Sequence, residues 1–188
     1  MRPAPLGTAL LLSFVVAAPA AAQGSIAHDG FWIGAGAGYG WSDYGDRPDD
    51  ARGGFSGHIR AGGTLRPNLL AGGESNGFYR IDQGVNYFWG ALMGTVSWYP
   101  VRTLPVFVKG GAGYLYTFAS EAISVEITSG HLAVQAGLGY DIHLGDHTAL
   151  TVVANWIKGF EGNLQIKGTT IDRVSPQLLQ LGVAFSLY

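Results

Sequence analysis

The chain has 188 residues, of which only 13% are charged, whereas an average soluble domain has about 25%. Eleven Lys and Arg stand against thirteen Asp and Glu, so the chain lacks the basic surface that nucleic-acid-binding proteins need. The sequence contains no cysteine, which excludes a disulfide framework and a thiolate metal site. Thirty glycines argue against long helices, because glycine is a poor helix former.

The first 23 residues are typical of a secretory signal peptide. Arg2 supplies a positive charge, and residues 6–18 form an apolar run of 13 residues. Alanines at positions 20–22 provide a cleavage site of small residues before Gln23. The apolar run is shorter than the roughly 20 residues that a membrane-spanning helix needs. We therefore expect removal of the leader and a mature domain over residues 24–188.

Eight segments of the mature chain alternate between apolar and small or polar residues, as β-strands do when their two faces meet different environments. In the sixth segment Leu132 and Val134 share one phase, whereas Gln135 and Asp141 share the other. The segment 86–98 holds large apolar residues in both phases, so the sequence leaves its outward face open. The predicted strands are 30–42, 53–65, 69–79, 86–98, 105–118, 130–142, 148–158 and 176–188.

Segments of this kind fit two all-β architectures. In a membrane-spanning barrel the apolar faces contact lipid and the polar faces line the lumen. In a soluble periplasmic barrel of the lipocalin type, the apolar side chains would point inward and the charges outward. The scarcity of charged residues favours the membrane, because few charges are left to cover a surface in water. We predict an eight-stranded antiparallel up-and-down transmembrane β-barrel, in which the strands satisfy one another's backbone hydrogen bonds.

The connections between the predicted strands alternate in length. Those after the odd-numbered strands are mostly longer than those after the even-numbered strands. Bacterial outer-membrane barrels have short periplasmic turns and longer outer loops. An even number of strands also returns both termini to the periplasmic side, as the leader requires. The connections therefore predict which end of the barrel faces the cell exterior.

Most charged residues fall in the loops, so the charged residues in the middle of predicted strands are informative. They are Arg60, Glu74, Lys109 and Asp141, and His58 lies close to Arg60. A lysine or arginine that faces hydrocarbon at mid-membrane costs about 2–4 kcal/mol, so we place these side chains in the lumen. Buried charges are costly when they are alone, so the two cations and two anions should pair. We predict a salt-bridge network that fills the barrel, with a small polar conduit as the alternative.

Five aromatic residues lie near the ends of predicted strands. Amphipathic rings settle at the boundary between membrane and water, so these residues are predicted to form interface belts. Packing in the core of a soluble protein is the alternative. The residues are Trp41, Trp98, Tyr99, Tyr116 and Trp156.

Two sets of residues invite a chemical interpretation. Ser56 and His58 share one face of the second strand, as a nucleophile and its base would, but no acidic residue lies nearby in the sequence to orient the histidine. His143, Asp146 and His147 could bind a metal, but Leu-Gly-Asp is ordinary turn chemistry between two strands. We predict no catalytic residue, no metal site and no cofactor.

The sequence resembles the small outer-membrane barrels of the OmpA/OmpX type. The resemblance lies in FWIGAGAGYGW, in SWYP followed by LPVFVKGGAGYLY, and in the terminal QLGVAFSLY. It implies an eight-stranded barrel that the outer-membrane assembly machinery inserts by reading a C-terminal strand that ends in an aromatic residue. Tyr188 departs from this pattern, because it lies in the opposite phase from Leu187 and Phe185.

The sequence thus predicts a non-enzymatic barrel in the outer membrane of a Gram-negative cell envelope. We expect a structural or surface-interaction role through the long outer loops, because loops on a rigid scaffold carry recognition. The expected partners are outer-membrane lipid, lipopolysaccharide and the assembly machinery, with no nucleic acid, and we expect a monomer. A small pore or transporter of hydrophobic compounds and a lipid A-modifying enzyme are the membrane alternatives.

Overall fold

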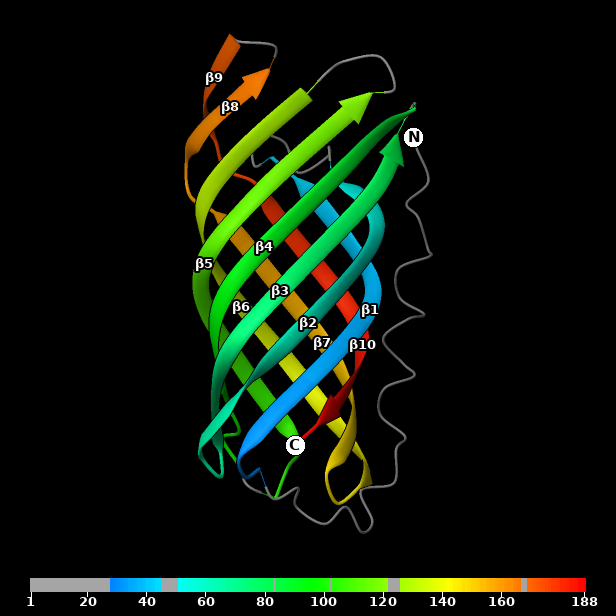
Figure 1. Cartoon of the computed structure of the whole chain (residues 1–188), viewed down its shortest axis with the longest axis vertical. Helices are drawn as coiled ribbons and strands as arrows, with labels where there is room; N and C mark the ends of the chain where they lie inside the picture. Colours follow the sequence, from blue (N-terminus) through cyan, green and yellow to red (C-terminus); the bar gives the residue numbers. More distant parts are fainter. Residues whose placement is uncertain (1–27, 45–50, 83, 102, 122–125, 167–168) are drawn as a thin grey trace, which may run out of the picture.

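The computed structural model describes residues 28–44, 51–82, 84–101, 103–121, 126–166 and 169–188. The predicted signal peptide lies outside these residues. The regular structure in the described part of the chain is β-strand (Figure 1). None of its elements is a helix long and apolar enough to cross a membrane.

Eight long strands form the wall of a closed antiparallel barrel (Figure 1). They are β1 (Phe31–Asp43), β2 (Arg52–Arg66), β3 (Leu69–Asp82), β4 (Val85–Trp98), β5 (Val106–Glu121), β6 (Glu126–Gly145), β7 (Thr148–Gly159) and β10 (Gln177–Leu187). Each strand pairs with its neighbour in sequence, and β1 pairs with β10 from Ile33↔Leu187 to Asp43↔Gln177 to close the wall. The predicted fold class and all eight predicted strands are confirmed.

A short hairpin that the sequence analysis assigned to a loop follows β7. Its strands are β8 (Gly162–Ile166) and β9 (Thr169–Val174), and β8 pairs with the first residues of β6. The hairpin lies at the upper end of the barrel in Figure 1, beyond the closed wall and opposite the C-terminus. We call the end that holds Tyr188 the lower end.

The connection between β3 and β4 is shorter than predicted. Asp82 pairs with Val85, so only positions 83 and 84 separate the two strands. Gly84 has a φ of 83°, which glycine adopts easily and which two-residue hairpin turns favour. Most of the predicted loop is therefore strand that extends the sheet upward.

The two faces of each strand meet different surroundings. On β4, Phe88, Leu92 and Val96 are exposed on the outer wall, whereas Trp89 and Met93 are buried inside. This assigns the outward face that the sequence left open. The sequence was ambiguous because this strand supplies large apolar residues both to the lipid-facing wall and to the packed interior.

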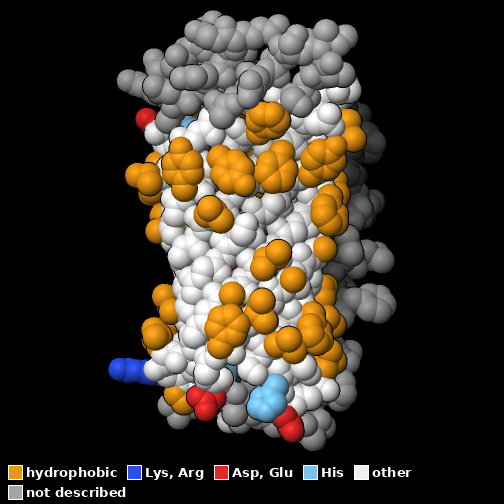
Figure 2. Space-filling model, in the orientation of Figure 1, with side chains coloured by type: hydrophobic (Ala, Val, Ile, Leu, Met, Phe, Trp, Pro, Cys, Tyr) orange, Lys and Arg blue, Asp and Glu red, His pale blue; other side chains and the backbone are white. Residues whose placement is uncertain are grey.

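The outer wall is apolar between its two ends. On the face shown in Figure 2, a row of large apolar side chains crosses the upper part of the wall, and a second group lies lower down. The acidic and basic side chains visible on this face lie near its two ends. Between the two groups the wall is mostly white in Figure 2, which marks backbone and side chains that are neither apolar nor charged.

Candidate functional site: the barrel interior

The interior is packed in three layers from the upper end to the lower end. The upper layer is an apolar cluster of Phe78, Trp89, Ala91, Met93, Leu115, Ala133, Ile157 and Leu178, against which Tyr44 packs. The lower layer contains Trp32, Leu70, Tyr99 and Phe107, with Tyr188 packed against them. Polar side chains fill the space between the two. An interior of eight strands is just wide enough for side chains to fill it.

Lys109 and Glu74 form an ion pair in the middle layer. Lys109 Nζ donates to Glu74 Oε2 at 2.5 Å, and the two side chains are 1% and 0% exposed. Glu74 Oε1 also accepts from Gln135 Nε2 at 2.9 Å and from Asn155 Nδ2 at 3.3 Å. The carboxylate therefore has one cationic and two neutral donors, which is what a buried charge needs.

A glycine on the adjacent strand β6 leaves space for the side chain of Lys109. Gly137 is the register partner of Lys109 across β5 and β6. A Cβ at Gly137 would lie 3.2 Å from Lys109 Cε and 2.7 Å from Asn155 Oδ1. The absence of a side chain there lets the lysine cross the lumen toward Glu74.

Arg60 and Asp141 are connected through a hydroxyl group instead of by a direct ion pair. Arg60 Nη2 donates to Ser186 Oγ at 2.7 Å and to Thr151 Oγ1 at 3.3 Å. Thr151 Oγ1 in turn donates to Asp141 Oδ1 at 2.5 Å. The prediction that the two cations pair with the two anions is therefore wrong for Arg60 and Asp141, which form no ion pair. The guanidinium also lies 5.5 Å from the ring centroid of Phe107, within the range of a cation–π contact.

Asp141 is held at the lower end by two tyrosines. Tyr99 Oη donates to Asp141 Oδ2 at 2.6 Å, and Tyr188 Oη donates to the same oxygen at 3.1 Å. The backbone N–H of Tyr188 donates to the carbonyl of His147, which fixes the end of the chain against the turn between β6 and β7. Burial, with the Asp141 charge as a second cause, raises the pKa of Tyr188 to about 12. The same causes raise the pKa of Tyr99 further.

Tyr99 does not belong to the interface belt in which the sequence analysis placed it. Its side chain is 4% exposed and points into the lower layer of the interior. Trp98 immediately before it is exposed on the outer wall. Successive side chains on an extended chain point in opposite directions, so the two rings were never both able to face the membrane.

The other four predicted interface residues are on the outer wall. Trp41, Trp98, Tyr116 and Trp156 all have exposed side chains in the outward phase of their strands. Their anchoring at a membrane boundary stays a prediction.

Ser56 and His58 are both buried inside the barrel. No hydrogen bond joins them, and His58 Nε2 has no partner among the described residues. A serine nucleophile needs its base within hydrogen-bond reach, so this pair lacks the geometry of a catalytic site.

A second Ser–His pair, which the sequence analysis missed, lies near the upper end. His131 Nδ1 is 3.0 Å from the carbonyl oxygen of Phe160, so this nitrogen carries the proton, and Nε2 accepts from Ser129 Oγ at 3.0 Å. Ser129 Oγ is also 2.7 Å from Thr117 Oγ1. Ser129 and His131 are two residues apart, as Ser56 and His58 are, and therefore share one face of their strand. The same spacing could have identified this pair in the sequence. The two residues are 4% and 2% exposed, so the contact closes the interior and offers no open nucleophile.

The comparisons with known proteins agree with this architecture. The model of the family described as outer membrane protein beta-barrel domain matches residues 8–186. No curated protein is significantly similar in sequence. Among solved structures, Neisserial surface protein A is similar with a TM-score of 0.64 at 13% identity, over 85% of this chain and 97% of that chain.

Two further barrels are similar at lower scores. Ail, the attachment invasion locus protein of Yersinia pestis, gives a TM-score of 0.53 at 11% identity over 85% of this chain and 99% of that chain. OprG from Pseudomonas aeruginosa gives 0.50 at 12% identity over 88% of this chain and 100% of that chain. At these identities the likeness shows the fold.

Proposed function

Because the chain belongs to the outer membrane protein beta-barrel domain family, we propose that it acts as a closed barrel of the outer membrane whose role is contact with other molecules at its extracellular end. The outer-membrane location excludes the soluble lipocalin-type alternative. The end that carries the β8–β9 hairpin is the extracellular one in this proposal, because this hairpin extends beyond the wall there, whereas two-residue turns join β2 to β3 and β6 to β7 at the other end (Figure 1). Outer-membrane barrels generally have short periplasmic turns and longer outer loops.

The packed interior is the observation that carries the proposal. Apolar layers lie above and below a polar layer whose central pair, Lys109 and Glu74, is almost fully buried. A route for ions would have to displace this pair together with Gln135 and Asn155, which bind the same carboxylate. A route for an apolar compound would have to cross the polar layer. The filled lumen therefore supports a closed barrel over the pore and transporter alternatives.

The absence of catalysis is also part of the proposal. The Ser56–His58 pair has no hydrogen bond between its members, and the Ser129–His131 pair is enclosed. A lipid A-modifying enzyme would need its nucleophile open to substrate at the outer wall or rim. Both pairs instead lie on the inward faces of their strands.

The charge of the extracellular end limits which partners it fits. The described residues at this end contain six Asp and Glu and four Lys and Arg, counted over 43–44, 51–52, 80–82, 84–85, 119–121, 126–130, 158–166 and 169–176. Ail has been solved in complex with the heparin analogue sucrose octasulfate, which is a polyanion. Binding of a polyanion depends on clusters of Lys and Arg. We therefore propose a neutral or cationic partner for this end, in addition to the lipid, lipopolysaccharide and assembly machinery expected for a monomeric barrel.

Conductance tests the closed lumen. The wild-type protein in planar lipid bilayers is expected to give no single-channel steps. The double variant Glu74→Ala with Lys109→Ala removes the central pair but keeps both apolar layers, so conductance is expected only when Trp89→Ala in the upper layer and Phe107→Ala in the lower layer are added to it. A control with Tyr116→Ala changes only the outer wall and should stay silent. Steps from the wild-type protein at the level of this fourfold variant would overturn the closed barrel, and retention of the protein on heparin resin at low salt would overturn the charge argument.

A further inference from the structure

The residues before β1 fold back over the lower end of the barrel. β1 begins at this end, where the C-terminus also lies (Figure 1). Gly30 has a φ of 75°, which glycine adopts easily, and its carbonyl oxygen accepts a hydrogen bond from the backbone N–H of Thr64 at 2.9 Å. The chain therefore turns at Gly30 just before it enters the wall. We call residues 28–30 the N-terminal strap.

His28 holds the strap against the lower layer of the interior. The residue is 9% exposed, and its ring centroid lies 4.4 Å from that of Tyr99 and 4.7 Å from that of Tyr188. Its Nδ1 is 3.2 Å from the carbonyl oxygen of Pro67 in the turn between β2 and β3. One side chain thus joins the start of the mature chain to a turn, to the end of β4 and to the C-terminal residue.

The hydrogen bond to Pro67 determines which ring nitrogen of His28 carries the proton. A carbonyl oxygen can only accept, so Nδ1 is the donor and Nε2 of the neutral ring is unprotonated. Nε2 is buried and has no hydrogen-bond partner among the described residues. A second proton would therefore give a full positive charge to a buried ring and place a donor where no acceptor lies, which is unfavourable.

The groups around His28 act on its charge in both directions. Burial has the largest effect and lowers the pKa of His28 from its usual value of 6.5. The hydrogen bond to Pro67 and the negative charge of Asp141 on β6 raise the pKa, whereas His143 on β6 and Arg60 on β2 lower it. The net effect of the closed strap is to favour the neutral ring.

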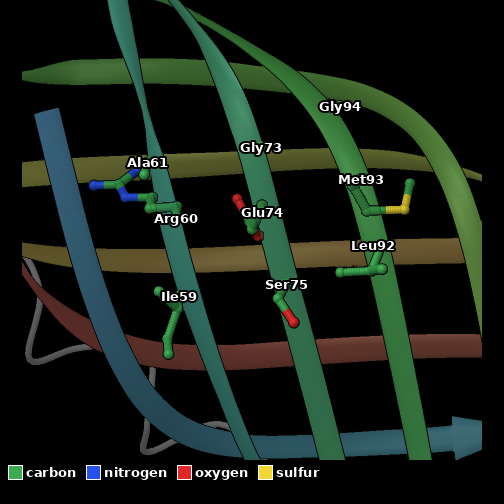
Figure 3. A pocket seen from close by; sticks show the side chains of 9 residues that line it. All are labelled: Ile59, Arg60, Ala61, Gly73, Glu74, Ser75, Leu92, Met93 and Gly94. Carbon is green, nitrogen blue, oxygen red and sulfur yellow. The ribbon is translucent and has the colours of Figure 1, made fainter. Parts of the chain in front are cut away.

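Arg60 keeps its effect on His28 because no carboxylate pairs with it directly. Figure 3 shows Arg60 on β2 next to Glu74 on β3, but the carboxylate of Glu74 is paired with Lys109. Asp29 in the strap and Arg66 in the turn below β2 are both exposed, so water screens their charges. The balance at His28 therefore depends on the buried groups.

We propose that the N-terminal strap opens in acid: it lies closed over the lower end while His28 is neutral and leaves it when the ring gains a second proton. The closed strap binds one proton fewer than the open strap, so a fall in pH favours opening. Closure is at full strength above pH 6.5, the usual pKa of histidine, and weakens as the pH falls below it. The proposal concerns the end opposite the β8–β9 hairpin and is independent of any partner at the extracellular end.

A spin label on the strap tests the proposal. The chain has no cysteine, so Asp29→Cys creates a single labelling site at an exposed position. With the mature protein in phospholipid vesicles, the electron paramagnetic resonance spectrum should be mainly that of an immobilised label at pH 8. The mobile fraction should rise at least twofold at pH 5. The matched control is Asp146→Cys, an exposed residue of the turn between β6 and β7 at the same end, and its spectrum should not change with pH.

Substitutions of His28 separate its charge from its contacts. His28→Phe keeps an aromatic ring against the two tyrosines, His28→Gln keeps a donor for Pro67, and neither side chain can gain a proton at pH 5. Both variants should remove the dependence on pH. His28→Ala removes both kinds of contact and should leave the label mobile at pH 8. His143→Gln should keep the wild-type response. Heat-dependent gel mobility reports that each variant is folded.

Four results would overturn the proposal. The first is a wild-type mobile fraction that is equal at pH 8 and pH 5. The second is a response that persists in both His28→Phe and His28→Gln, or that His143→Gln abolishes, because the titrating group would then be another one. The third is an immobilised label in His28→Ala, which would show that this side chain does not hold the strap. The fourth is an equal response of Asp146→Cys, which would mean that acid loosens the whole lower end.

Discussion

Glu74 and Asp141 are two buried carboxylates that the same barrel interior holds in different ways. Glu74, in the middle layer, is in direct contact with the ammonium group of Lys109. Asp141, toward the lower end, accepts hydrogen bonds from the hydroxyls of Thr151, Tyr99 and Tyr188. Its cation, Arg60, is one hydroxyl away.

The difference shows what each part of the interior depends on. Loss of either member of a direct ion pair removes all of its stabilisation, because the other member is left as an uncompensated buried charge. A carboxylate held by three neutral donors loses them one at a time, and each loss is smaller. We therefore expect the middle layer to be sensitive to single substitutions and the lower end to respond in graded steps.

Lys109→Ala is expected to have the largest effect, because it leaves Glu74 buried without its cation. The free energy of unfolding should fall by about 3–5 kcal/mol. Urea unfolding from phospholipid vesicles, followed by tryptophan fluorescence, measures this change. The control is the double variant Lys109→Met with Glu74→Leu, which removes both charges and keeps the volume. It should recover most of the loss, and a double variant as unstable as the single one would contradict the dependence on charge pairing.

Tyr99→Phe tests the graded behaviour of the lower end. It removes one of the three hydroxyl donors of Asp141 and keeps the ring that packs against Phe107. The free energy of unfolding should fall by about 2 kcal/mol, as expected for a hydrogen bond to a charged group. Tyr116→Phe on the outer wall should change stability by less than about 0.5 kcal/mol. A Tyr99→Phe loss equal to that of Lys109→Ala would remove the contrast between the two carboxylates.

Most of the barrel could be predicted from the sequence because lipid and a narrow lumen impose a period of two on every strand. The β8–β9 hairpin was missed because it extends beyond the closed wall, where that pattern no longer separates two environments. Tyr99 was misplaced because its amphipathic ring and its place near a strand end match an interface residue. Because successive side chains point in opposite directions, the outward Trp98 implies that the next side chain, Tyr99, points inward.

The partners inside the lumen were harder to predict than the faces. The inward phase places Arg60, Glu74, Lys109 and Asp141 in the interior, where the structure has them. Which of them meet depends on the strand register and on the tilt of the strands across the barrel, and the period of the sequence contains neither. Arg60 and Glu74 are register neighbours on β2 and β3, yet Glu74 pairs with Lys109 from β5.

The departure of Tyr188 from the alternation of the last strand has a cause in the structure. The ring turns inward to Asp141, which explains why Tyr188 lies in the opposite phase from the outward Leu187 and Phe185. At the lower end, burial therefore takes the last aromatic residue away from the lipid-facing row.

Tyr188→Phe is expected to have the smallest effect, about 1 kcal/mol at neutral pH, because its hydrogen bond to Asp141 is the longer of the two tyrosine bonds. Its clearest effect is on the pH dependence. The pKa of Tyr188 is raised from 10.0 to about 12 in the folded protein, so its stabilisation is complete below pH 10 and is lost as the pH rises through about 12. Urea unfolding as a function of pH should therefore show a decline above pH 10 that is shallower in Tyr188→Phe. The decline should be shallowest in the double variant with Tyr99→Phe, because the pKa of Tyr99 is raised for the same reasons. Equal alkaline slopes in all three proteins would mean that the two hydroxyls are not coupled to folding, and the lower end would then depend on Thr151 and Arg60 alone.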